Sequence, residues 1–296
     1  MRFVSALVLL AACATAPPRP PAPPAPPPAK QNPSPMVDST RAHQRVEQRE
    51  PRGRRVAITG VLEKAVEVLA TPAVSDHADI VIHFHGASWL PMQAAEETER
   101  PLVIASVNLG AGSRRYSIPF EDPAAFVRLR ERIASEVPKA DKVYLTGFSA
   151  GYGAIREILR QRPDEIDGVL LLDGLHAGYV PDGKPLADGG TIDAQAMEPF
   201  FRYAERAVRG ETRFVVTHSE IFPGTFVSTT ETADYLIQAL KLRRTPLLEW
   251  GPLGMQQLSK VEEGGLTILG FAGNTAPDHI DHLHAYQHFL KLLIGD

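Results

Sequence analysis

Residues 143–154, Val-Tyr-Leu-Thr-Gly-Phe-Ser-Ala-Gly-Tyr-Gly-Ala, contain the turn that decides the fold. The first four residues predict a buried strand, and the residues from Ala150 onward predict a helix. Ser149 stands between the two elements, with Gly147 and Gly151 two positions to either side. A sharp turn from strand to helix has no room for larger side chains there, and it holds the serine in a strained backbone conformation. The pattern favours a nucleophilic serine over a merely structural serine at a tight turn.

Apolar runs of strand length alternate with helical patterns on both sides of this turn. Strands are expected at 56–62, 65–69, 80–85, 102–107, 142–148, 168–172, 213–217 and 266–270, and helices at 126–137, 150–160, 194–208, 230–242 and 280–294. Short apolar strands that alternate with helices predict an α/β fold, a mostly parallel sheet with helices on both faces. Active residues should lie at the carboxyl ends of its strands. Only one loop and one helix fit between 173 and 213, so we expect a minimal cap.

A serine nucleophile needs hydrogen-bond donors for the oxyanion that forms on the attacked carbonyl. In an arrangement of this kind, one donor is the backbone N–H of the residue after the serine, here Ala150. The other donor comes from the loop after an earlier strand. In this chain that loop carries His85-Gly86-Ala87 at the end of the third expected strand.

With this His-Gly loop and the Gly-x-Ser-x-Gly turn, the chain resembles the α/β-hydrolase superfamily over residues 56–296. The resemblance implies an eight-stranded sheet, a Ser–acid–His triad in that chain order, and hydrolysis of esters or amides without a cofactor. It also implies that the N–H of Ala87 is the second oxyanion donor. We expect His85 itself to brace the loop rather than to transfer protons.

Two carboxylates follow the serine at strand ends. Asp173 ends the strand at 168–172, and Glu220 follows the next strand. The later position is the commoner one in the superfamily, and the earlier one is a known variant. A short carboxylate directly at a strand end would project into the site, whereas Glu220 is longer and sits beside Phe222-Pro223-Gly224. Asp173 is therefore favoured as the acid, with Glu220 as the alternative, and a purely capping role for Asp173 stays open.

The histidine should follow the last strand, where residues 278–284 read Asp-His-Ile-Asp-His-Leu-His. The terminal helix is expected to bury four residues at three- to four-residue spacing, Leu283, Tyr286, Leu290 and Leu293. At about 100° per residue, His279 lies about 40° from Leu283, whereas His282 and His284 each lie about 100° away. We therefore favour His279 as the general base. In the alternative, His279 caps the helix, and His282 reaches into the site from the first helical turn as the general base.

A metal-dependent hydrolase is an alternative interpretation of the histidines. His83 and His85 follow a strand, and together with the cluster at 278–284 they could bind a metal. This interpretation leaves the serine turn without a role, and Ser88 and Trp89 do not continue a familiar metal motif. No metal or other cofactor is expected.

The composition of the 296-residue chain argues against several kinds of partner and site. The chain has 31 Lys+Arg against 35 Asp+Glu, a net charge of −4, and 44% hydrophobic residues. This near-neutral balance argues against a nucleic-acid partner. A single cysteine excludes an internal disulfide framework and a zinc site of several cysteines.

The N-terminus has the pattern of a secretory signal. A basic start and about eight mostly apolar residues precede Leu10-Ala11-Ala12-Cys13, which resembles the bacterial lipobox. In a lipobox, cleavage occurs before the cysteine and its sulfur is then lipidated. We expect lipidation at Cys13, and Ala14 in place of aspartate favours the outer membrane. The alternative is an ordinary signal peptide with a chance cysteine.

A proline-rich spacer follows this signal. Eleven of the 26 prolines lie between Pro17 and Pro35, and such a segment cannot bury enough apolar surface to fold. The 20 residues of the spacer, 16–35, would reach roughly 60 Å as a polyproline II helix. The polar run 44–55 is also expected to be unpacked. The expected domains are therefore a signal peptide (1–12), a lipidated tether (13–55) and a hydrolase domain (56–296).

Together these patterns predict a serine hydrolase of the carboxylesterase type, lipid-anchored in the bacterial cell envelope. Its partners would be the membrane, through Cys13, and a small-molecule or acylated polymer ester substrate. A non-catalytic lipoprotein that keeps the fold for binding is a second alternative. The substrate and the oligomeric state are not encoded in any recognisable pattern.

Overall fold

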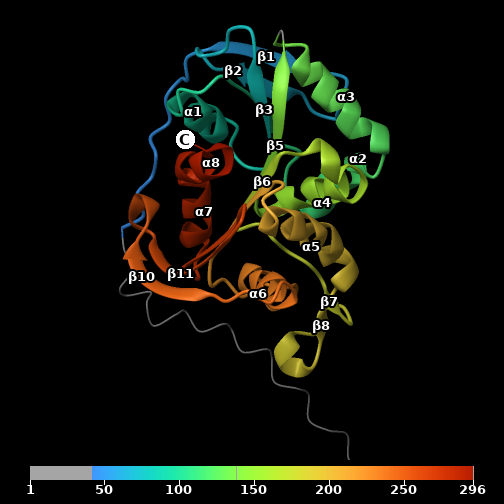
Figure 1. Cartoon of the computed structure of the whole chain (residues 1–296), viewed down its shortest axis with the longest axis vertical. Helices are drawn as coiled ribbons and strands as arrows, with labels where there is room; N and C mark the ends of the chain where they lie inside the picture. The colour runs from blue at the N-terminus through green and yellow to red at the C-terminus, as the bar shows by residue number, and fades with distance from the viewer. Residues whose placement is uncertain (1–41, 138, 296) are drawn as a thin grey trace, which may run out of the picture. The chain divides into compact units, whose positions relative to one another are not determined.

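The computed structural model describes residues 42–137 and 139–295, so Cys13 and the proline-rich segment lie outside the described residues. Ten strands form one sheet in the order β1-β2-β4-β3-β5-β6-β9-β12-β11-β10 (Figure 1). These strands are β1 (Arg54–Ile58), β2 (Val66–Ala70), β3 (Ala78–Phe84), β4 (Leu102–Val107), β5 (Ala140–Phe148), β6 (Gly168–Leu172), β9 (Arg213–His218), β10 (Thr245–Trp250), β11 (Gln256–Glu263) and β12 (Leu266–Phe271). A separate short pair joins β7 (Tyr179–Val180) to β8 (Thr191–Ile192).

The sheet is mostly parallel, as predicted, but it has ten strands rather than eight. The strands from β4 to β12 in the sheet order run parallel to one another, and the outer strands at both edges are antiparallel. The prediction missed the β10–β11 hairpin. The reason is that β10 is an exposed edge strand containing Pro246, and β11 mixes buried Val261 with charged residues. Neither has the continuous apolar run of a central strand.

Helices cover both faces of the sheet (Figure 1). They are α1 (Trp89–Glu97), α2 (Ser113–Phe120), α3 (Pro123–Ala134), α4 (Tyr152–Gln161), α5 (Ala194–Val208), α6 (Thr229–Ala239), α7 (Ala276–His284) and α8 (Tyr286–Ile294). One buried cluster contains apolar residues of α1, α7 and α8, and a second contains those of α2 to α6. Among the described residues, no helix is both long enough and apolar enough to cross a bilayer.

The single terminal helix predicted at 280–294 is two helices. The first begins four residues earlier than predicted, at Ala276, because Thr275 and Asp278 form a reciprocal capping box. It ends at His284, and α8 then buries Tyr286, Leu290 and Leu293 as the spacing predicted. The earlier start places His279 in the first turn of a helix that follows the last strand.

Residues 42–53 lie against the domain, so the prediction that 44–55 is unpacked is wrong. Arg45 and His43 each approach the fully buried carboxylate of Asp281 to 2.8 Å. Arg52 pairs in the same way with Glu96, whose side chain is only 3% exposed. The charges of this run suggested a solvated segment. In the structure they neutralise buried carboxylates on α7 and α1, which no local pattern identifies.

Candidate active site

Ser149 has the backbone strain that its sequence context predicted. It directly follows β5 with φ of +45°, in the left-handed region that a serine rarely adopts. A Cβ added to Gly151 would lie 2.1 Å from the carbonyl oxygen of Phe84. Only glycine therefore lets the following helix start so close to β3. The result is a serine presented at the carboxyl end of β5, partly exposed.

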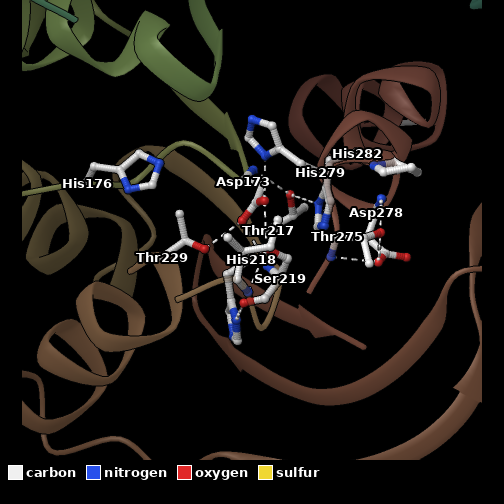
Figure 2. A network of polar contacts seen from close by, with 12 residues as sticks. Asp173, His176, Thr217, His218, Ser219, Thr229, Thr275, Asp278, His279 and His282 are labelled. Atoms are coloured by element: carbon white, nitrogen blue, oxygen red, sulfur yellow. Dashed lines mark hydrogen bonds and ion pairs between the residues drawn. The ribbon is translucent and has the colours of Figure 1, made fainter. Parts of the chain in front are cut away.

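Asp173 is the carboxylate that the structure brings to this edge of the sheet. It directly follows β6, and its side chain is 2% exposed. Its Oδ1 accepts hydrogen bonds from the backbone N–H of Ser219 (2.9 Å) and from the hydroxyl of Thr229 (2.6 Å). Its Oδ2 accepts from the hydroxyl of Ser219 (2.8 Å) and from Nδ1 of His279 (2.6 Å) (Figure 2).

These contacts keep Asp173 ionised. Burial alone would raise its pKa, but the neighbouring His282 and His279 and the hydrogen bonds from His279 and Thr229 hold the pKa well below its usual range. Asp173 can therefore act as a fixed negative charge beneath a histidine. A Cβ added to the next residue, Gly174, would lie 2.9 Å from the backbone nitrogen of Ser149, so this carboxylate lies beside the serine turn.

His279 lies between the acid and the serine turn. Its Nδ1 faces Asp173, and its ring packs on the ring of Phe148 at a centroid distance of 4.4 Å. Phe148 immediately precedes Ser149 in the chain. The His279 side chain is 24% exposed, so solvent or a substrate can reach it. With Nδ1 committed to the carboxylate, Nε2 is the ring nitrogen left to exchange a proton.

The alternative residues are placed differently. The carboxylate of Glu220 accepts a hydrogen bond from the backbone N–H of Gly273 (3.3 Å), rather than from a histidine. His282 is 1% exposed, and its Nδ1 faces the hydroxyl of Thr217 (2.7 Å). Burial lowers the pKa of His282 to about 4, so it is neutral at pH 7. The geometry favours the Asp173–His279 pair over a pair containing Glu220 or His282.

The predicted oxyanion loop lies beside this pair. His85, with φ of +72°, and Gly86, with φ of +111°, turn the chain sharply after β3, and α1 begins two residues after Ala87. The ring of His85 stacks on the ring of Phe148 at 5.9 Å, and its Nδ1 meets the hydroxyl of Tyr116 at 2.9 Å. His85 is thus held by its neighbours, as a bracing residue would be.

Sequence reasoning missed the residues that hold Asp173. Ser219 donates two hydrogen bonds to the carboxylate of Asp173, and Thr229 donates one from the start of α6. Thr217 accepts a hydrogen bond from the backbone N–H of Asp173 at 3.1 Å. The position of Ser219 at the end of a strand was a usable signal. Thr229 gave no signal, since a threonine at a helix start is typical of an ordinary cap.

The histidines proposed for the metal alternative are engaged with protein groups. Nδ1 of His83 meets the hydroxyl of Thr146 at 2.9 Å, and its Nε2 meets the carbonyl of His85 at 2.7 Å. Within the described part of the chain, one group of three potential metal ligands comes close together, His43, Asp278 and Asp281. It includes Asp278 and Asp281 of the predicted cluster but none of that cluster's histidines, and Asp281 pairs with Arg45. Among the described residues, His83 and His85 belong to no such group.

Three buried histidines predict a loss of stability in mild acid. Burial lowers the pKa of His83 to about 3 and that of His282 to about 4, and burial with the charge of Arg244 lowers that of His218 to about 4. The unfolded chain, with histidine pKa near 6.5, binds these protons first. The contribution of these histidines to the free energy of unfolding is therefore fully present above about pH 6.5. As the pH decreases further, the free energy of unfolding falls by up to about 4 kcal/mol per pH unit for the three groups.

Urea unfolding measured at pH 7, 6 and 5 checks this expectation. The midpoint should fall steadily between pH 6.5 and pH 5, before the carboxylates titrate. A midpoint that stays constant over this range would show that the three histidines are not held neutral in the folded state.

The comparisons with known proteins identify the fold. No protein-family model and no curated protein matches the chain. Among solved structures, enterochelin esterase of Shigella flexneri aligns with 83% of this chain over 59% of the esterase's own chain (TM-score 0.52, 14% identity). Ferric enterobactin esterase of Salmonella typhimurium matches the same shares (TM-score 0.50, 13% identity). The substrate-bound fluorophosphonate-binding serine hydrolase F of Staphylococcus aureus matches 83% of this chain and 100% of its own (TM-score 0.49, 10% identity). The two esterase matches, together with the mostly parallel sheet, show that the chain has the α/β-hydrolase fold.

Proposed function

We propose that this chain is a serine hydrolase and, more specifically, a carboxylic-ester hydrolase. The observation that carries the proposal is the 2.6 Å hydrogen bond between Nδ1 of His279 and Asp173, beside a strained serine at the same edge of the sheet. The proposed nucleophile, acid and general base come from three separate parts of the chain and follow one another as Ser149, Asp173 and His279.

The proposed reaction proceeds through an acyl-enzyme. Oγ of Ser149 forms a bond to the ester carbonyl carbon while Nε2 of His279 takes the hydroxyl proton. The N–H groups of Ala150 and Ala87 would stabilise the resulting oxyanion. His279 then gives its proton to the departing alcohol, and a water molecule activated by the same nitrogen cleaves the acyl-enzyme. Asp173 holds the imidazole in one tautomer and stabilises its charged form.

The surroundings of the site suit substrates of varied size. The chain between β6 and α5 contains only the short β7–β8 pair and a brief turn at Leu186–Asp188, so little structure covers the edge. Phe222 and Phe226, in the segment after β9, are each 43% exposed and offer apolar surface. This supports a substrate range that includes small esters and acylated polymers.

Hydrolysis of p-nitrophenyl esters by the purified chain tests the proposal. Turnover of acetate and butyrate esters should persist in excess EDTA, because each proposed step uses only protein groups and water. Loss of turnover on chelation would favour a metal-dependent hydrolase. Absence of turnover over the whole ester panel, together with specific ligand binding, would favour the non-catalytic alternative.

The assignment of the acid gives a graded prediction. Asp173→Asn should lower kcat by about 10²–10⁴-fold, because an amide cannot hold the imidazole in the productive tautomer. Glu220→Gln should leave kcat within about threefold, because its carboxylate bonds a loop backbone rather than a histidine. Steady-state kinetics of the two variants decide the matter, and the reverse ranking would move the acid to the later strand.

The lipid anchor at Cys13 is a further part of the proposal, and it rests on the sequence pattern alone. Cys13→Ser in a bacterial host should abolish labelling by a clickable fatty acid and release the protein from the membrane fraction. Unchanged membrane retention of the unlabelled variant would contradict a lipid anchor.

A further inference from the structure

The loop that carries the proposed oxyanion donor is held through its carbonyl groups. The first of these, on His85, accepts a hydrogen bond from Nε2 of His83 at 2.7 Å. A carbonyl can only accept, so the proton of His83 is on Nε2, and Nδ1 accepts from the hydroxyl of Thr146 (2.9 Å). That hydroxyl in turn accepts from the hydroxyl of Tyr286 (2.7 Å). These polar groups form one directed chain of hydrogen bonds that ends on the loop.

The chain of hydrogen bonds is buried throughout. His83, Thr146 and Tyr286 are each 0% exposed. Burial lowers the pKa of His83 to about 3, so the ring is neutral at pH 7 and keeps a single tautomer there. A buried, fully paired network of this kind fixes the position of its last acceptor, because any movement would leave a polar group unpaired.

The second carbonyl, on Gly86, is held from the neighbouring strand. Nδ2 of Asn108, which directly follows β4, donates to it at 2.8 Å. The side-chain oxygen of Asn108 accepts from the backbone N–H of Gly110 (3.2 Å), and this fixes which end of the amide faces the loop. The third carbonyl, on Ala87, accepts from the backbone N–H of Leu90 (3.1 Å) at the start of α1.

Fixing the carbonyls also fixes the N–H groups. The C=O and N–H of a trans peptide point in opposite directions. The N–H of Gly86 therefore points away from His83, and the N–H of Ala87 points away from Asn108. In the described part of the chain, neither N–H donates to a backbone carbonyl. No acceptor for either N–H is found among residues 42–137 and 139–295, so both can donate to a bound substrate.

We propose that His83 and Asn108 are positioning residues that direct the N–H groups of Gly86 and Ala87 toward the substrate oxyanion. This inference rests on the proposed hydrolase function and deepens it. Neither side chain touches the reacting atoms. Each acts by holding a loop carbonyl, so that two donors are preorganised before the negative charge develops, and preorganised donors contribute most in the transition state.

Two variants test the inference, one in the loop after β4 and one within β5. Asn108→Leu removes the donor to Gly86 at nearly constant size, and Thr146→Val removes the donor to His83 in the same way. Both should lower kcat for ester hydrolysis by about 10- to 100-fold and change KM by less than about threefold. The loss stays below the 10²–10³-fold effect of deleting a whole oxyanion donor, since the N–H groups remain but are less well placed.

The inhibition constant of a trifluoromethyl ketone separates positioning from a general structural role. The adduct of this inhibitor carries an oxyanion, so its affinity should weaken by the same factor as kcat/KM. Thr212→Val is the matched control, because Thr212 is a buried threonine directly before β9, at the opposite end of that strand from the site. It should leave kcat and the inhibition constant unchanged, and thermal unfolding identifies any variant that fails to fold.

Two outcomes would overturn the inference without touching the proposed function. The first is an active enzyme in which both variants keep kcat and the inhibition constant within twofold of the unsubstituted chain. The second outcome is an unchanged amide NOE in Asn108→Leu, and it can be measured without enzymatic activity. The ¹H–¹⁵N heteronuclear NOE of Gly86 and Ala87 should fall in Asn108→Leu, because the loop loses a restraint. An unchanged NOE at both amides would contradict the positioning role, even in a chain that hydrolyses no ester.

Discussion

Ser149→Ala is expected to lower kcat for p-nitrophenyl ester hydrolysis by about 10⁴-fold or more. Alanine removes the atom that forms the acyl-enzyme, and loss of the nucleophile of a serine hydrolase costs nearly as much as loss of the whole triad. The small side chain should keep the turn folded, because Gly151 and not Ser149 determines the close approach of the helix. Steady-state kinetics, together with a thermal unfolding curve, measure the effect.

Ser75→Ala is the matched control for this change. Ser75 is exposed, and its hydroxyl bonds the neighbouring Asp76, so kcat of the Ser75→Ala variant should equal that of the unsubstituted chain. If Ser149→Ala retained more than about a tenth of the activity, Ser149 would not be the nucleophile. Retained activity that vanished with EDTA would indicate metal-activated water as the attacking group.

His279→Ala should be nearly as damaging as Ser149→Ala. Removal of the base alone leaves the serine hydroxyl without a proton acceptor, and triad members act as a unit whose effects do not add. The double variant with Ser149→Ala should therefore be no less active than either single variant. His279 is partly exposed in the first turn of α7, so its truncation should leave the domain folded.

His288→Ala supplies the comparison for the loss of a histidine at the C-terminal end. His288 is exposed on α8 and should be replaceable without effect on kcat. His282→Ala differs from both, because it empties a buried position and breaks a contact with Thr217. It should lower the unfolding temperature, whereas kcat should keep a substantial fraction of its value in the unsubstituted chain. Near-normal turnover in His279→Ala would transfer the role of the base to another histidine.

The serine turn could be predicted from sequence because its physical requirements are local. A strained serine needs glycine on either side, and Gly147 and Gly151 satisfy that need within five residues. The central strands were also predictable, since burial on both faces demands continuous apolar runs such as Leu170-Leu171-Leu172. The resemblance implied the order serine, acid, histidine, and the ends of the expected strands then pointed to Asp173 and His279 as candidates.

Features that depend on distant partners could not be predicted. The ion pairs between residues 43–52 and the buried carboxylates of Glu96 and Asp281 join segments 44 or more positions apart, and no periodicity marks them. The hydroxyl of Thr229 reaches Asp173 from the start of α6, and its sequence context is that of a common helix start. The hairpin β10–β11 adds edge strands whose polar residues face solvent.

The choice between His279 and His282 shows where pattern reasoning reaches its limit. Angular position on the helix placed His279 near the apolar side, and this agreed with its contact to Asp173. The same reasoning placed His282 on a flank, whereas it is 1% exposed and lies among Phe271, Phe289 and Thr217. A helical wheel gives direction around one helix, but burial depends on the sheet against which the helix packs.

The central claim is that Ser149 is the nucleophile, and fluorophosphonate labelling followed by peptide mass spectrometry tests it most directly. Attack by the serine oxygen on phosphorus forms an O–P bond and releases fluoride, so one covalent adduct records the reacting atom. We predict a single adduct per chain, on the peptide containing Ser149, and none in Ser149→Ala or after heat denaturation. An adduct on any other residue, or no adduct on a chain that hydrolyses esters, would contradict the account.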